Sequence, residues 1–225
     1  MPVTTISAET HAKSSFAHKP NPHHTNLSSQ HDTEQTNTST PHERNPDHIP
    51  HTNQTEDSYV LTLHTSQKHH STMTSLRKTY FPPRINKLGA HIALFRAIPG
   101  SHLPTIKSDI RSLTAHTSSF PIRADAPFRL SHGIAIGVSD GGPESKRIHA
   151  ELRDRWYDVL SNQDRGGFRA HYTIMNKVDD EQAVRQAWDE LSGAFKGSDG
   201  VVEGLALWRY EKGWWKDREV FRFAH

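Results

Sequence analysis

The 225-residue chain contains no cysteine. This absence excludes a disulfide-stabilised fold, a thiolate nucleophile, and zinc or iron–sulfur sites built on cysteine ligands. Long apolar runs are also missing: no segment approaches the roughly 20 residues of a membrane-spanning helix, and the N-terminus lacks the apolar core of a secretory signal. We therefore expect a soluble protein of the cytoplasm or nucleus without membrane contacts.

The first quarter of the chain has little that can form a core. Residues 1–56 contain nine apolar residues and no glycine, but six prolines and eight histidines. Such a composition cannot bury enough apolar surface to offset the chain entropy lost on folding. The sequence predicts a disordered tail rich in His, Thr, Asn and Pro over 1–56 and a folded domain over 57–225.

The charge of the domain indicates its class of ligand. The tail holds three basic and six acidic residues, which leaves 27 − 3 = 24 basic and 25 − 6 = 19 acidic residues in the domain. A net charge of +5 favours an anionic ligand such as a phosphate or a short nucleic acid. It is too small to steer long duplex DNA by charge alone, so duplex DNA is not expected as a partner.

Apolar periodicity in the domain alternates between strand and helix patterns. Strands are predicted near 59–63, 89–98, 130–138, 168–178, 201–210 and 219–223, and helices near 66–79, 102–114, 143–160 and 179–195. The alternation is typical of an α+β or α/β layered domain.

Two of the predicted strands echo each other. They read Ala90-His91-Ile92-Ala93-Leu94-Phe95 and Ala170-His171-Tyr172-Thr173-Ile174-Met175, and a helix follows each of them. The two histidines are 80 residues apart, about half of the domain, as a duplication would leave them. Two similar halves that face each other across a cleft would bring the histidines together.

A facing pair of imidazoles suits phosphodiester chemistry without a metal. One neutral histidine takes a proton from the attacking oxygen, and the other, protonated, gives one to the leaving oxygen. Histidine serves both purposes because its pKa of about 6.5 makes both forms accessible near neutral pH. Thr173 lies two residues after His171 and shares its strand face, so its hydroxyl would donate to a non-bridging phosphate oxygen. The sequence does not decide which histidine is the acid.

These residues resemble a known family, the 2H phosphoesterase superfamily, which includes 2′-5′ RNA ligase-like proteins and cyclic nucleotide phosphodiesterases. Beyond the two motifs, the resemblance rests on four segments: Leu76-Arg77 with Tyr80-Phe81-Pro82-Pro83, Leu94-Phe95-Arg96-Ala97-Ile98-Pro99-Gly100, Asn176-Lys177-Val178, and Gly204-Leu205-Ala206-Leu207-Trp208-Arg209-Tyr210. It covers roughly residues 58–225. It implies a bilobal α+β fold, with two pseudo-symmetric sheet-plus-helix lobes around a central cleft. It also implies that His91 and His171 are the catalytic pair and that Thr173 contacts phosphate.

The chain departs from the family pattern at one position. The first motif reads His91-Ile92-Ala93-Leu94, with alanine where the family has Thr or Ser, so this hydroxyl contact is not carried over. The bare pattern H-x-[S/T] also occurs at His64, His69, His70 and His116. The strand-then-helix context, rather than the pattern, therefore distinguishes positions 91 and 171.

Two further residues are candidates for substrate binding. Arg169 shares the predicted face of His171 and would hold a phosphate oxygen, unless it is a solvated arginine at the strand end. Phe95 shares the face of His91 and would stack on a base, with a place in the core as the alternative. His23-His24 and His69-His70 lack the ligand spacing of a defined site, so no metal and no cofactor are expected.

The leading hypothesis is a metal-independent phosphoesterase that acts on 2′,3′-cyclic or 2′-5′-linked nucleotides or RNA ends. Ala93 favours an alternative, a non-catalytic module that binds nucleotides or RNA ends on the same fold. A histidine-rich metal buffer that acts through the tail is the third possibility. We expect a monomer whose ligand is a nucleotide or an RNA end.

Overall fold

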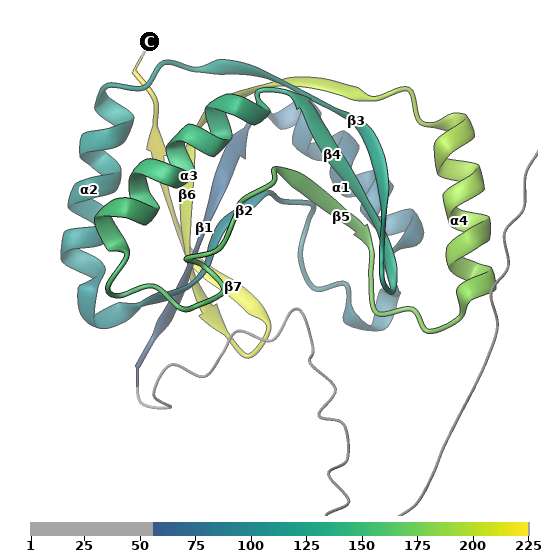
Figure 1. Ribbon diagram of the computed structural model, residues 1–225, viewed down its shortest axis with the longest axis horizontal. Helices are drawn as coiled ribbons and strands as arrows, with labels where there is room; N and C mark the ends of the chain where they lie inside the picture. The colour runs from purple at the N-terminus through teal and green to yellow at the C-terminus, as the bar shows by residue number, and fades with distance from the viewer. Residues whose placement is uncertain (1–55, 225) are drawn as a thin grey trace, which may run out of the picture. The chain divides into compact units, whose positions relative to one another are not determined.

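The computed structural model describes residues 56–224 (Figure 1). The tail predicted over 1–56 lies outside the described residues except for Glu56. The strands are β1 (Ser58–Thr65), β2 (Ala93–Pro99), β3 (Phe120–Leu130), β4 (Gly133–Asp140), β5 (His171–Met175), β6 (Ser198–Glu211) and β7 (Trp214–Arg222). The helices are α1 (Gln67–Tyr80), α2 (Leu103–Ala115), α3 (Gly142–Trp156) and α4 (Glu181–Ala194), with the 3₁₀ turns η1 (Pro83–Ile85) and η2 (Gly100–His102).

Antiparallel pairing joins these strands into one sheet with the order β2-β1-β6-β3-β4-β5, and β7 pairs with β6. Helices pack against this sheet, and α2 also contacts α3. The predicted α+β class is therefore confirmed. The division into two pseudo-symmetric lobes is not confirmed, because the described strands belong to a single sheet.

The helices form where the predicted spacing of apolar residues places them. Helix α2 buries Ile106, Ile110 and Leu113 in successive turns. At the start of α4 the Asp180 carboxylate accepts hydrogen bonds from two backbone N–H groups, those of Gln182 and Ala183, and so caps the helix. Within residues 56–224 we find no helix with the length and apolar character needed to cross a membrane.

Strand β3 is the element that the sequence pattern did not predict. It contains Pro121 and Pro127, which lack the N–H group that a central strand uses on both sides. Both prolines lie where β3 has a single neighbour: Pro121 pairs with β6 only, and Pro127 pairs with β4 only. Each proline can therefore turn its missing donor away from a partner strand.

The two strands that were predicted to contain the histidines are shorter than expected and lie at opposite edges of the sheet. β2 begins at Ala93 rather than near residue 89, so His91 precedes it by two residues, whereas His171 is the first residue of β5. In the sheet order β2 is first and β5 is last. They nevertheless lie near each other in Figure 1, since the sheet curves.

Candidate active site

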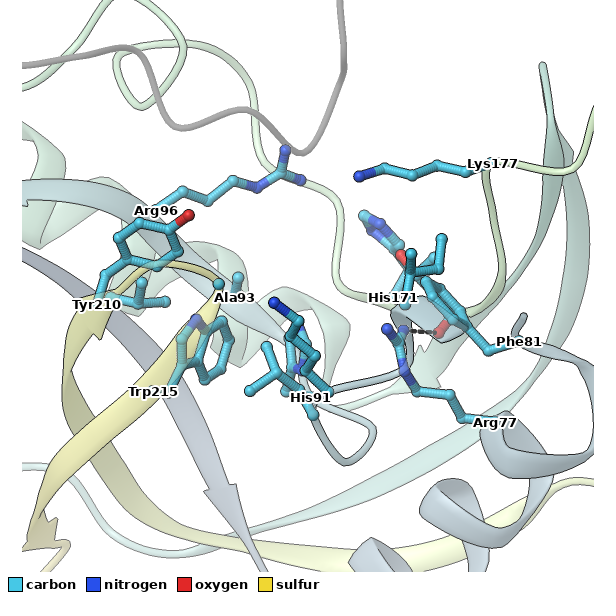
Figure 2. A pocket seen from close by; sticks show the side chains of 15 residues that line it. Arg77, Phe81, His91, Ala93, Arg96, His171, Lys177, Tyr210 and Trp215 are labelled. Atoms are coloured by element: carbon cyan, nitrogen blue, oxygen red, sulfur yellow. Dashed lines mark hydrogen bonds between the residues drawn. The ribbon is translucent and has the colours of Figure 1, made fainter. Parts of the chain in front are cut away.

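A cavity of about 330 Å³ lies between the two edge strands, and both motif histidines line it (Figure 2). Its other lining residues are Val60, Arg77, Phe81, Ile85, Lys87, Leu88, Ala93, Arg96, Thr173, Lys177, Tyr210, Gly213 and Trp215. The structure thus brings His91, His171 and Thr173 together, as the sequence predicted. Ala93 also faces this cavity, so the position without a hydroxyl belongs to the site.

The same kind of hydrogen bond orients the rings of the two histidines. Nδ1 of His91 donates a hydrogen bond to the carbonyl oxygen of Gly89 at 2.8 Å, and Nδ1 of His171 donates one to the carbonyl oxygen of Arg169 at 2.7 Å. A carbonyl oxygen only accepts, so Nδ1 carries the proton in both rings. The neutral tautomer therefore leaves the Nε2 lone pair of each ring available as a base.

Burial lowers the pKa of both histidines. For His91, burial and then the charge of Arg77 lower the pKa to about 3, although the bond to Gly89 acts in the opposite direction. The Trp215 ring covers His91, with ring centroids 4.3 Å apart. Burial also lowers the pKa of His171, and Arg96 adds to this. Burial therefore favours the neutral form of both imidazoles in the absence of a ligand.

The cavity is positively charged. Four cationic residues line it, and none of the described residues that line it is acidic; the cations are Arg77, Lys87, Arg96 and Lys177. Arg77 is 7% exposed. Its guanidinium donates to the Thr173 carbonyl oxygen at 2.6 Å and lies 3.6 Å from the centroid of the Phe81 ring. A buried cation next to two neutral imidazoles favours an anionic ligand.

Phe95 does not line the cavity, which corrects its prediction as a base-stacking residue. It is fully buried and stacks on His149, with centroids 4.8 Å apart. Strict alternation along β2 would place it on the cavity side. However, the β1–β2 register is irregular, because Leu61 pairs with Phe95 while Tyr59 pairs with Ile98.

This irregularity is a bulge, in which Arg96 and Ala97 lie opposite the single residue Val60. A second irregularity lies between Ala93 and Phe95, whose partners Thr62 and Leu61 are adjacent. This second irregularity shifts the alternation by one residue, so that Ala93 and Arg96 lie on the cavity side and Phe95 in the core.

Arg169 is likewise not among the residues that line the cavity. Its side chain is exposed and lies over the Phe128 ring, 3.9 Å from the centroid, beside a separate shallow hollow that Lys146 also lines. The alternative of a solvated arginine at the strand end is therefore the one that the structure supports. Its contribution to the site is its carbonyl oxygen, which orients His171.

Several residues of the site were not among the predicted ones. Arg77 and Lys177 belong to segments that carried the family resemblance, which was the available signal. Tyr210 and Trp215 come from the β6–β7 hairpin. Arg96 also belongs to such a segment, but its place toward the cavity depends on the irregular register of β2. Within residues 56–224 no group of three or more acidic or histidine side chains is placed to hold a metal ion.

The fold and the cavity together define a mixed α+β protein with paired histidines in a basic site. The sequence model of the 2′-5′ RNA ligase superfamily matches residues 65–214. The chain therefore belongs to this superfamily, as its motifs indicated.

Solved structures agree with this assignment at the level of the fold. LigT of E. coli, crystallised with 3′-AMP, is 11% identical; the match covers 74% of this chain and 99% of LigT, with a TM-score of 0.51. TT0787 of Thermus thermophilus is 15% identical, with 75% of this chain and 100% of TT0787 covered and a TM-score of 0.51. A structure described as a phosphoesterase is 12% identical, with coverage of 74% and 99% and a TM-score of 0.52. No curated protein matches the chain.

Proposed function

We propose that the protein is a phosphoesterase that acts on 2′,3′-cyclic or 2′-5′-linked nucleotides or RNA ends through His91 and His171, without a metal. The observation that carries this proposal is the matched pair of Nδ1–carbonyl hydrogen bonds at one basic cavity. Each bond fixes a tautomer with Nε2 available for proton transfer. A site with two such nitrogens holds both partners of acid–base catalysis.

The environments of the two rings favour a division of roles. His91 has its pKa lowered to about 3, so it is neutral across the physiological range and acts as the base. His171 acts as the acid, because a bound phosphate anion raises the pKa of a neighbouring imidazole and stabilises its protonated form.

In the hydrolysis of a 2′,3′-cyclic phosphate, Nε2 of His91 takes a proton from water as the water oxygen bonds to phosphorus. The bond from phosphorus to one ribose oxygen breaks, and that oxygen receives the proton from Nε2 of His171. Afterwards His91 is protonated and His171 is neutral. Exchange of one proton with solvent at each ring restores the starting state.

Two groups of the site would stabilise the charge on the phosphate. The Thr173 hydroxyl lies two residues beyond His171 and lines the cavity. Arg77 supplies a buried positive charge, held in place by its bond to the Thr173 carbonyl oxygen. Donors fixed in advance stabilise a transition state without reorganising during the reaction.

The size and lining of the cavity support a nucleotide as the ligand. A volume of about 330 Å³ is in the range of small-molecule sites. Tyr210 and Trp215 offer aromatic surface beside the cations, and aromatic rings stack on bases. LigT, which shares the fold, was crystallised with 3′-AMP.

The second candidate function is a module that binds nucleotides or RNA ends without turning them over. The observation in its favour is Ala93, which lines the cavity where a hydroxyl would contact the phosphate. Its predicted behaviour differs in one respect: it binds the ligands but forms no product.

The deciding assay incubates the purified protein, with EDTA present, with 2′,3′-cyclic nucleotides, 2′-5′ dinucleotides and RNAs that end in a cyclic phosphate. We expect product from the wild type, and a kcat lower by about 10²–10⁴ in His91→Ala and in His171→Ala. His116→Ala is the matched control, because Nδ1 of His116 also bonds to a backbone carbonyl, that of Ser112 at 2.9 Å, but outside the cavity. Turnover like that of the wild type in either cavity variant would refute the paired mechanism. Binding without product from the wild type would support the second function.

A further inference from the structure

Of the four cations that line the cavity, Arg96 and Lys177 lie apart from Arg77. Figure 2 shows the Arg96 and Lys177 side chains extending toward each other in the upper part of the view, above His91, His171 and Arg77. Arg77 is buried, whereas Arg96 is half-buried and Lys177 is exposed. Two cations that converge favour an anion between them, because it offsets their mutual repulsion. This pair thus marks a second position for negative charge, nearer to solvent than the first.

Hydrogen bonds to the backbone fix the position of Arg96 in β2. The bulge in β2 leaves the N–H groups of Arg96 and Ala97 without regular strand partners, and the carboxylate of Asp164 accepts from both. These distances are 3.0 and 3.1 Å from the nitrogen of Arg96 to the two carboxylate oxygens and 2.9 Å from that of Ala97. Asp164 is 5% exposed, and an aspartate is rarely buried unless it has partners such as these N–H groups. Without these bonds the bulge would leave two N–H groups unsatisfied in a buried place.

The backbone of Lys177 has an uncommon conformation. Its φ of 61° is in the left-handed region, which non-glycine residues seldom adopt. The side chain of Asn176, which is buried, accepts a hydrogen bond from the Lys177 N–H at 2.8 Å. This turn directly follows β5 and brings Lys177 to the cavity that His171 lines.

We infer that Arg96 and Lys177 form a subsite for a second phosphate of the substrate, separate from the phosphate that reacts between His91 and His171. The inference rests on the proposed function and narrows its substrate class to nucleotides that carry a phosphate on the 5′ oxygen besides the 2′,3′-cyclic phosphate. Arg96 offers a planar fork of donors and Lys177 a point charge, a combination that suits a phosphate. Asp164 is the positioning residue that holds Arg96 in the subsite.

The test compares three substrates: adenosine 2′,3′-cyclic phosphate, its 5′-phosphorylated form, and a dinucleotide whose 3′ nucleoside carries the cyclic phosphate. The last two separate a free 5′-phosphate from the diester of an RNA end. For the wild type we expect kcat/KM to be at least tenfold higher with the second phosphate than without it. Arg96→Ala and Lys177→Ala should each reduce this ratio at least fivefold, and Arg96→Lys should retain part of it.

Two exposed residues of α3 are the matched controls. Arg147→Ala and Lys146→Ala each remove one positive charge away from the cavity and should leave the ratio unchanged. Asp164→Asn should reduce the ratio as Arg96→Ala does, and it should add nothing in the Arg96→Ala background. A purely structural role for Asp164 would instead lower kcat/KM for all three substrates alike in both backgrounds.

Failure of the subsite and failure of the proposed function give different results. Turnover with equal kcat/KM for substrates with and without the 5′-phosphate would overturn the subsite and leave the phosphoesterase proposal intact. If no substrate is turned over, calorimetric titration with adenosine 3′-phosphate and adenosine 3′,5′-bisphosphate decides the matter. Tighter binding of the bisphosphate that is lost in Arg96→Ala and Lys177→Ala would support the subsite in a binding module, and equal binding would overturn it.

Discussion

Restoring the missing hydroxyl at Ala93 is the sharpest test of whether the cavity is catalytic. Ala93 is half-buried, lines the cavity and lies two residues after His91, as Thr173 does after His171. The change Ala93→Thr adds two heavy atoms on the side of the cavity, and its β-branched side chain suits a strand. Its hydroxyl would line the cavity from β2, as that of Thr173 does from β5.

The size of the effect follows from the kind of interaction. One hydrogen-bond donor aimed at the charge that develops in an acyl or phosphoryl transfer is worth about 2–4 kcal/mol. At about 1.36 kcal/mol for each tenfold change in rate, this corresponds to an increase in kcat of about 30-fold to 900-fold. KM should change much less, because the donor favours the transition state over the ground state.

The assay is the initial rate with the best 2′,3′-cyclic phosphate substrate, over a range of concentrations that separates kcat from KM. Ala93→Val is the matched control, since valine has the shape of threonine without the hydroxyl. A kcat for Ala93→Thr no higher than that for Ala93→Val would refute the reasoning that a phosphate oxygen lies beside this position.

Four further predictions concern the pKa values and the core. The proposed mechanism requires a neutral His91 and a protonated His171, so kcat/KM should rise above about pH 3 and fall above the lowered pKa of His171, which is below 6.5. The fall in kcat should occur at a higher pH than the fall in kcat/KM, because bound phosphate raises the pKa of His171. A kcat/KM that stays constant from pH 4 to 9 would contradict this. The unfolded state binds a proton at His91 near pH 6.5 and the folded state only near pH 3, so the folded state loses stability as the pH falls through this window. Between pH 7 and pH 4 the melting temperature of the wild type should therefore fall by several degrees more than that of His91→Gln. Trp215→Ala should uncover His91 and move its pKa, measured by NMR titration, toward 6.5, whereas an unchanged value would mean that other groups bury the ring. Phe95→Ala should cost about 3–5 kcal/mol in the free energy of unfolding, measured with urea, because the ring is fully buried.

Local sequence was enough to locate most elements and both histidines. The apolar spacing of α2 and α4 predicted their buried faces, because a helix that covers a sheet repeats its contacts every three or four residues. Strand β3 escaped the same reasoning. Its prolines argue against a strand until the pairing shows that Pro121 and Pro127 each have a single neighbour. That pairing depends on β4 and β6, and no local pattern around the prolines reveals it.

Strand β2 shows why alternation predicted the wrong aromatic residue. The rule that residues i and i+2 share a face assumes a regular strand, and it pairs His91 with Phe95. The register irregularity between Ala93 and Phe95 shifts this alternation by one residue, so Phe95 enters the core and Arg96 lies toward the cavity. The bulge that follows at Arg96 and Ala97 is stabilised by Asp164, which lies 68 residues further along the chain than Arg96. No window around Phe95 contains this information.

The site thus combines two kinds of determinant. The orientation of each histidine requires only a carbonyl oxygen two residues earlier, so the same short stretch of chain can produce it twice, at His91 and at His171. The cations come from separate elements: Arg77 from α1, Arg96 from the bulge in β2, and Lys177 from the turn after β5. Their position depends on the curvature of the whole sheet, which brings its two edges together. The groups proposed for proton transfer are therefore specified locally and can be recognised from a motif, whereas the proposed selection of an anionic ligand depends on the tertiary structure.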